Sequence, residues 1–341
     1  MKKKWEMVFM GVVLIAFFGM IFFPTSVVAG PVKLRYACFT PAPAFPSIQM
    51  ERWKKEVEKR TGGKVAITTY NGGTLLNAKN MMDGVVAGQA DIGVLVTAYQ
   101  PGRFIVTNAT SLPIGFPDSL VASLTLWDFY RKYKPREFDE VKVLTMFTNP
   151  PADLLTKKPM RKLEDLQGKN LRGSGGAAKV LKAWGANPIG MPISEAAESL
   201  QKGVIDGMLS SAEVMKFFKF AESCRYMTKT ASVIYPFAVV MNWDSWKRLP
   251  KDVQKVMDDM ATEHSIWMGE FNNRMVGETT AWSKKNYNVE VITLPKEEKA
   301  RWDKKVEPIT AGWIKKAKKR GLPAEKMVED IKALARKHAN P

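Results

Sequence analysis

The chain has 341 residues, of which 45% are hydrophobic and 25% are charged, a composition typical of one large or two medium globular domains. Its 52 Lys and Arg residues against 34 Asp and Glu residues give a net charge of +18, which suits an anionic partner. The basic residues are mixed with acidic ones in helical patterns, which indicates solvated faces rather than a nucleic-acid surface.

The N-terminus has the pattern of a secretory signal. Lys2–Lys4 precede an apolar run from Met7 to Phe23, and Val27–Ala29 supplies a small-residue cleavage site. We predict cleavage after Ala29 and export from the cytoplasm, which excludes nucleic acid as a partner. The alternative is an uncleaved anchor, because the uncharged run from Met7 to Val32 is long enough to span a bilayer.

The segment after the signal alternates predicted strands and helices. The first unit has strands at 33–38, 65–70 and 91–96, a helix at 47–60, and a second helix that Asn77 caps and Gly88 ends. This order predicts a mostly parallel α/β sheet.

A similar unit follows. It has strands at 169–172, 187–191 and 204–209, a helix at 177–184, and a helix that Ser194 caps and Gly203 ends. In both units a Gly-x-x-Asp sequence joins the second helix to the last strand, at Gly88–Asp91 and at Gly203–Asp206. Two similar units predict two lobes rather than one long sheet.

The rest of the chain is predicted to be mainly helical. Helices are expected at 251–268, 271–285, 302–319 and 324–338, with one short strand at 289–294.

The sequence lacks the residues that common enzymes and metal sites need. Its two histidines, His264 and His338, have no partner at metal-ligand spacing, and no phosphate-binding or dinucleotide-binding glycine motif is complete. We therefore expect no catalytic residue, no metal and no cofactor. Cys38 and Cys224 either form a disulfide or serve as small buried residues.

The sequence around Arg172 is typical of an anion receptor. Arg172 ends a predicted strand, and Gly173–Gly176 then opens a helix, whose start carries free N–H groups and a partial positive charge. The planar guanidinium fits a carboxylate. The alternative is a structural arginine that pairs with a nearby acid.

Other polar and aromatic residues also follow predicted strands. Ligands of open α/β sheets bind at the carboxyl ends of strands. This rule selects residues from both units and so predicts a ligand cleft between them. We add Asn149 and the aromatic residues Phe237 and Tyr235 to the lining of this cleft. The predicted ligand-binding residues are Phe39, Thr40, Thr97, Tyr99, Asn149, Arg172, Ser174, Ser210, Ser211 and Phe237.

Several segments together resemble the DctP-type solute-binding proteins of TRAP (tripartite ATP-independent periplasmic) transporters. The likeness runs from about residue 33 to the end, and its motifs are Gly168–Arg172, Gly185–Glu195, Leu200–Gly207, Gly84–Gly93 and Trp246–Pro250. It implies a two-lobed α/β periplasmic binding protein fold with an interlobe ligand cleft and a helical C-terminal region, in which long strands and a helix join the lobes. Lobe I is expected to comprise residues 30–149 and 238–277, and lobe II residues 150–237 and 278–341.

The resemblance also implies a function. It implies a monomeric or dimeric periplasmic receptor that closes on a small organic acid and delivers it to the membrane permease subunits of a TRAP transporter. Arg172 matches the arginine that holds the ligand carboxylate in this family.

Two departures from the family pattern bear on the ligand. The family often has Gln-Glu-Asn-Pro after Asp-Gly, where this chain has Met208–Ser211 and lacks the asparagine. Members that bind sialic acid carry a second arginine in the strand that enters the second lobe, where this chain has Thr148–Asp153. One cation in an apolar neighbourhood predicts a monocarboxylate with an apolar or aromatic body.

Three other functions are alternatives: a receptor for a signalling partner, a secreted enzyme on the same scaffold, and a cationic surface-binding protein. Adjacent genes for small and large membrane subunits would favour transport, and a neighbouring sensor kinase would favour signalling. An enzyme would need an acid and a base in the cleft, and the sequence offers no such pair.

Overall fold

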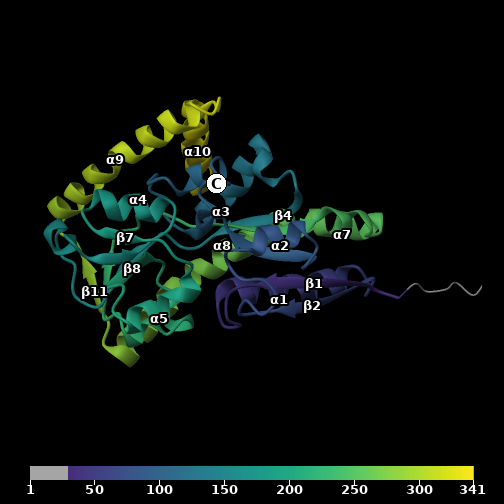
Figure 1. The fold of residues 1–341 in the computed structure, drawn as a ribbon, viewed down its shortest axis with the longest axis horizontal. Helices are drawn as coiled ribbons and strands as arrows, with labels where there is room; N and C mark the ends of the chain where they lie inside the picture. Colours follow the sequence, from purple (N-terminus) through teal and green to yellow (C-terminus); the bar gives the residue numbers. More distant parts are fainter. Residues whose placement is uncertain (1–29, 341) are drawn as a thin grey trace, which may run out of the picture. The chain divides into compact units, whose positions relative to one another are not determined.

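Two mixed β-sheets organise residues 30–340, the part of the chain that the computed structural model describes (Figure 1). The predicted signal peptide, residues 1–29, lies outside the described residues. The strands are β1 (Val32–Cys38), β2 (Val65–Tyr70), β3 (Ile92–Val96), β4 (Val141–Thr148), β5 (Asp153–Thr156), β6 (Asn170–Arg172), β7 (Asn187–Ile189), β8 (Gly207–Ser210), β9 (Tyr226–Lys229), β10 (Pro236–Asn242) and β11 (Glu290–Thr293).

Helices cover both sheets. They are α1 (Phe45–Arg60), α2 (Met81–Val86), α3 (Ser119–Tyr133), α4 (Gly176–Ala183), α5 (Ala196–Gln201), α6 (Val214–Phe217), α7 (Trp243–Lys247), α8 (Lys251–Tyr287), α9 (Lys296–Lys318) and α10 (Ala324–Ala339). Among residues 30–340, none of these helices combines the length and the apolar character needed to cross a membrane.

Each sheet combines parallel and antiparallel pairs. The first has the order β2-β1-β3-β10-β4, and β10 runs antiparallel to both β3 and β4. The second has the order β11-β9-β5-β8-β6-β7, and β5 runs antiparallel to both β8 and β9. The predicted parallel arrangement is correct for β1, β2 and β3 and for β6, β7 and β8, whereas β10 and β5 add antiparallel pairs that the sequence did not predict. All seven residues of β10 are buried, so this strand lacks the alternation of polar and apolar residues that marks a strand in a sequence.

Three segments connect the two sheets. Residues 149–152 lead from β4 to β5, residues 230–235 lead back from β9 to β10, and α8 precedes β11. The first two lie side by side, since the Ala152 N–H donates to the Val233 carbonyl (2.8 Å) and the Ser232 N–H donates to the Ala152 carbonyl (3.1 Å). This architecture confirms the predicted two-lobed α/β fold. The lobe boundaries stay a prediction.

The two C-terminal helices pack against different parts of the molecule (Figure 1). Helix α9 lies against α4, where the Trp184 indole N–H donates to the Trp302 carbonyl (3.1 Å). Helix α10 lies against α3, where the Tyr133 hydroxyl donates to Asp330 (2.6 Å). The predicted helical C-terminal region is thus present, and its last helix lies against a helix that covers the first sheet.

Helix α8 is one continuous helix of 37 residues, where the sequence predicted two helices separated near Gly269. Gly269 does not break it. A Cβ at this position would collide with the backbone of Leu120 in α3, so the glycine allows the two helices to pack closely. Helix α9 begins at Lys296 rather than at Trp302.

Two predicted helix caps are wrong. Asn77 accepts hydrogen bonds from the backbone of Lys79 and Asn80, so it stabilises the turn before α2 rather than the helix itself. Ser194 lies inside a short 3-10 turn before α5, and the residue at the start of that helix, Glu195, makes no side-chain cap.

The repeated Gly-x-x-Asp sequence has the same structural role in both sheets. Asp91 accepts from the Arg35 N–H of β1 (2.7 Å), and Asp206 accepts from the Asn170 N–H of β6 (3.0 Å). In each case the backbone N–H of the aspartate donates back to the same strand residue. Gly88 and Gly203 both have φ of +71°, which favours glycine. These aspartates therefore fix the spacing of neighbouring strands.

Both cysteines are free and buried. Burial raises the pKa of the Cys224 thiol to about 12, which keeps it protonated and unreactive. The structure therefore supports the prediction that Cys38 and Cys224 are small buried residues and not the alternative that they form a disulfide.

Candidate ligand-binding site

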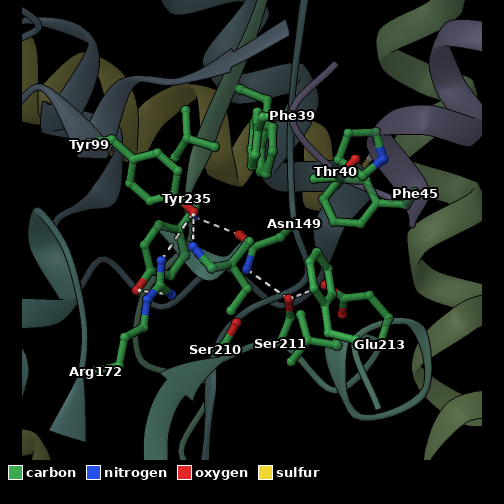
Figure 2. A pocket seen from close by; sticks show the side chains of 16 residues that line it. Phe39, Thr40, Phe45, Tyr99, Asn149, Arg172, Ser210, Ser211, Glu213 and Tyr235 are labelled. Atoms are coloured by element: carbon green, nitrogen blue, oxygen red, sulfur yellow. Dashed lines mark hydrogen bonds between the residues drawn. The ribbon is translucent and has the colours of Figure 1, made fainter. Parts of the chain in front are cut away.

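A cavity lies where loops from both sheets meet (Figure 2). Its volume is about 30 Å³, so the lining side chains leave little free space in it. Three of its residues lie at strand ends: Phe39 follows β1, Arg172 ends β6 and Ser210 ends β8. Asn149 and Tyr235 come from residues 149–152 and 230–235, the two segments that connect the sheets side by side and are called the crossing segments below. The lining residues are Phe39, Thr40, Phe45, Pro46, Val96, Tyr99, Asn149, Arg172, Ile193, Ser210, Ser211, Glu213, Val214, Phe218, Tyr235 and Phe237.

Eight of the ten predicted site residues line this cavity. They are Phe39, Thr40, Tyr99, Asn149, Arg172, Ser210, Ser211 and Phe237. Thr97 does not line it, because its side chain is buried and donates to Asn108 (2.8 Å). Ser174 lines a neighbouring hollow instead, and its hydroxyl donates to the Met191 carbonyl (3.3 Å). The ligand-binding role of the eight residues stays a prediction.

Arg172 is the one basic side chain among the lining residues, and it is only 1% exposed. Its Nε donates to the Met191 carbonyl (3.0 Å), its Nη2 to the Tyr99 hydroxyl (3.1 Å), and its Nη1 to the Tyr235 hydroxyl (3.4 Å). No carboxylate of residues 30–340 lies within ion-pair distance of it. An arginine in a protein stays charged, so this side chain is a buried cation with neutral partners.

Aromatic rings surround this cation. The Tyr99 and Tyr235 rings lie 5.7 and 5.4 Å from the guanidinium carbon, at cation–π distance. Phe39 packs edge-on against Tyr99, with ring centroids 6.0 Å apart. Phe45 packs in the same way against Phe237, at 5.1 Å. Such a wall excludes water and lowers the local dielectric, which strengthens any ion pair that Arg172 forms.

A chain of hydrogen bonds runs along the cavity from the crossing segments to an acidic residue. The Tyr235 N–H donates to the Asn149 side-chain oxygen (2.6 Å), and the Asn149 amide donates to the Ser211 hydroxyl (2.9 Å). The Ser211 hydroxyl donates to Glu213 Oε1. In the view of Figure 2, Arg172 and Glu213 lie on opposite sides, with Asn149 and Ser211 between them.

Several lining residues were not predicted from the sequence. Glu213 comes three residues after the end of β8, so a wider window after each predicted strand would have included it. Phe45 opens α1 rather than following a strand directly. Among residues 30–340, no group of three or more His, Cys, Asp and Glu side chains is arranged to hold a metal ion.

The glycines after Arg172 allow a close backbone approach. A Cβ on Gly175 would lie 2.9 Å from the Ala98 side chain, and one on Gly176 would collide with the Ser111 carbonyl. The Gly173 N–H donates to the Ile189 carbonyl, and the Ser174 N–H points to the Tyr235 hydroxyl at 3.5 Å. Close packing accounts for the two glycines at the start of α4, in addition to the anion-binding role predicted for this turn.

This packing gives a testable prediction. We expect Gly176→Ala to lower the free energy of unfolding by about 1–3 kcal/mol, because the added methyl group overpacks the contact with Ser111. Gly190→Ala is the matched control, since a Cβ there meets nothing within 4 Å. Urea denaturation of both variants is the measurement. Equal stability of the two would contradict the assigned role of Gly176.

Comparison with known proteins gives the family. Residues 42–316 match the DctP family, the bacterial extracellular solute-binding proteins of family 7. The chain belongs to this family. The family is extracytoplasmic, and its members are solute-binding proteins, which confirms the resemblance drawn from the sequence.

Individual members of the family support this assignment. This solute-binding protein is 27% identical to the 2,3-diketo-L-gulonate-binding periplasmic protein of Escherichia coli K12, over 81% of this chain and 85% of the relative. A TRAP periplasmic solute-binding protein from Desulfovibrio salexigens is 46% identical, with a TM-score of 0.80 over 90% of this chain and 97% of the other. A marine metagenome TRAP solute-binding protein specific for aromatic acid ligands, solved with 3-hydroxybenzoate, is 28% identical, with a TM-score of 0.85 over 91% and 99%.

Proposed function

We propose that this protein is the periplasmic receptor of a TRAP transporter for a small monocarboxylate with an aromatic or apolar body. In this proposal Arg172 binds the carboxylate, the two lobes close on the acid, and the loaded receptor delivers it to the membrane permease subunits. The chain is exported with cleavage after Ala29 and works as a monomer or dimer without turnover of the ligand.

The observation that carries the proposal is the buried guanidinium of Arg172. A buried cation without an anionic partner destabilises the unliganded protein, and a ligand carboxylate would supply the missing charge in a bidentate geometry. The lining residues in the described part of the chain contain no second basic side chain, which favours one carboxylate over two.

The remaining lining supports an apolar ligand body. Phe39, Phe45, Phe218 and Phe237 line the cavity. The structurally similar marine protein is specific for aromatic acids, which agrees with this choice.

A ligand screen tests the proposal. The protein is unfolded, freed of copurified ligand, refolded, and mixed with benzoate, 3-hydroxybenzoate, mandelate, succinate or glucuronate. We expect the aromatic monocarboxylates to raise the melting temperature and to bind with one site per chain in calorimetry, because binding stabilises only the folded state. Stabilisation by glucuronate or succinate alone would refute the proposed ligand class.

A further inference from the structure

Glu213 is a second buried ionisable group in the cavity, and the proposed binding of the carboxylate by Arg172 does not involve it. It is 1% exposed and lines the cavity. Its Oε1 accepts from Ser211, whereas its Oε2 is buried and has no partner among residues 30–340. A buried polar atom without a partner costs free energy, so such atoms in native proteins usually have an unseen partner.

The hydrogen-bond chain holds this carboxyl in place. Ser211 fixes Oε1, and Asn149 fixes Ser211 in turn through its amide. Asn149 itself is held by the Tyr235 N–H, and Tyr235 also contacts Arg172. The acid at one end of the cavity and the cation at the other are thus connected through one hydrogen-bond network.

The surroundings of Glu213 disfavour a full negative charge. Burial raises its pKa to about 7, and the nearby Asp153 carboxylate adds to this effect. No Lys or Arg side chain in the described part of the chain forms an ion pair with it. A carboxyl that titrates near neutrality can either donate to or accept from a hydroxyl.

We propose that Glu213 is a specificity-determining residue, whose free Oε2 hydrogen-bonds a hydroxyl group on the ligand at the end away from the carboxylate that Arg172 binds. This inference rests on the proposed function. The ligand class is then a hydroxylated aromatic monocarboxylate, with its ring between the phenylalanine walls.

A hydroxyl suits this position better than an ammonium group. An ammonium carries three N–H donors and needs acceptors for all of them. Glu213 offers one free oxygen, and Phe45, Val214 and Phe218 of the same lining offer none. A single hydroxyl matches that one oxygen.

The test compares paired ligands on paired variants by calorimetry, using refolded, ligand-free protein. The probes are benzoate, 3-hydroxybenzoate, 4-hydroxybenzoate and 4-(aminomethyl)benzoate. We expect the wild-type protein to bind at least one hydroxybenzoate 10-fold or more tightly than benzoate. Glu213→Leu should lose this preference while its affinity for benzoate stays within about threefold, and Glu213→Gln, which keeps a polar group, should retain part of it.

The outcomes separate this inference from the function on which it rests. If no aromatic monocarboxylate binds, the proposed function fails. If benzoate binds but Glu213→Leu keeps the wild-type preference for a hydroxybenzoate, or if the wild type prefers 4-(aminomethyl)benzoate, the role of Glu213 is refuted and the function stands. Glu198→Gln is the matched control, because Glu198 lies on the surface with Lys202, and we expect it to leave all four affinities unchanged.

Discussion

Replacing Arg172 by Met is expected to abolish most ligand binding while the protein remains folded. The variant loses the one basic group that faces the cavity, and truncating one partner of a buried charge pair costs about 2–5 kcal/mol. This corresponds to a loss of affinity of about 30- to 5,000-fold for benzoate or 3-hydroxybenzoate, measured by calorimetry.

The same substitution should not lower the stability of the unliganded protein. Arg172 is a buried cation with neutral partners, and replacing such a group by an apolar side chain of similar length is often neutral or stabilising. We therefore expect the melting temperature of ligand-free Arg172→Met to equal or exceed that of the wild type. A purely structural arginine would instead give a large fall.

A surface arginine provides the control for this experiment. Arg131 lies in α3, with 60% of its side chain exposed, and its ion pair with Asp128 is long at 3.6 Å. Arg131→Met should leave affinity and melting temperature unchanged. If Arg172→Met binds the aromatic acids as tightly as Arg131→Met, Arg172 does not hold the carboxylate.

The second large effect is expected at His264, and it concerns acid stability. This side chain is 0% exposed in α8, and neither ring nitrogen has a hydrogen-bond partner among residues 30–340. Burial lowers its pKa from 6.5 to about 3, and the charges of Arg52 and Arg60 add to this shift, while Glu263 opposes it. The ring is therefore neutral in the folded state at any pH above about 3.

Stability should fall with falling pH, because His264 binds a proton more readily in the unfolded state than in the folded state. The unfolded chain takes up a proton at His264 below pH 6.5, whereas the folded protein takes it up only near pH 3. The contribution of the neutral ring to the free energy of unfolding is fully present above pH 6.5 and is lost as the pH falls. By pH 4 the difference amounts to about 3 kcal/mol in the free energy of unfolding.

His264→Leu should remove this acid sensitivity. At pH 7 both proteins are neutral at this position, so their stabilities should be similar. At pH 4 the variant should be more stable than the wild type by about 3 kcal/mol, measured by urea denaturation at a series of pH values. Parallel stability curves for the two proteins between pH 7 and pH 4 would contradict the assignment.

The rule that ligands bind at the carboxyl ends of strands predicted most of the residues that line the cavity, whereas the antiparallel strands β5 and β10 were not predicted. Phe39 follows β1, whereas Arg172 and Ser210 end β6 and β8, and the carboxyl ends of parallel strands meet at one edge of a sheet. Strand β10 was missed because it is buried on both faces, which removes the period-two alternation. The continuity of α8 was missed because a glycine usually weakens a helix, whereas Gly269 is needed for packing against α3.

The sequence by itself determined the α/β character of the chain, its family and the arginine of the candidate site, because these depend on local patterns and on motifs. Only the tertiary structure decided which charges are left without a partner. Arg172 and Glu213 are 41 positions apart in the chain, and the neutral groups around Arg172 come from residues as distant as Tyr99 and Tyr235. Burial and pairing depend on three-dimensional packing, so no local pattern could show that the cavity holds both an unpaired cation and an unpaired acid.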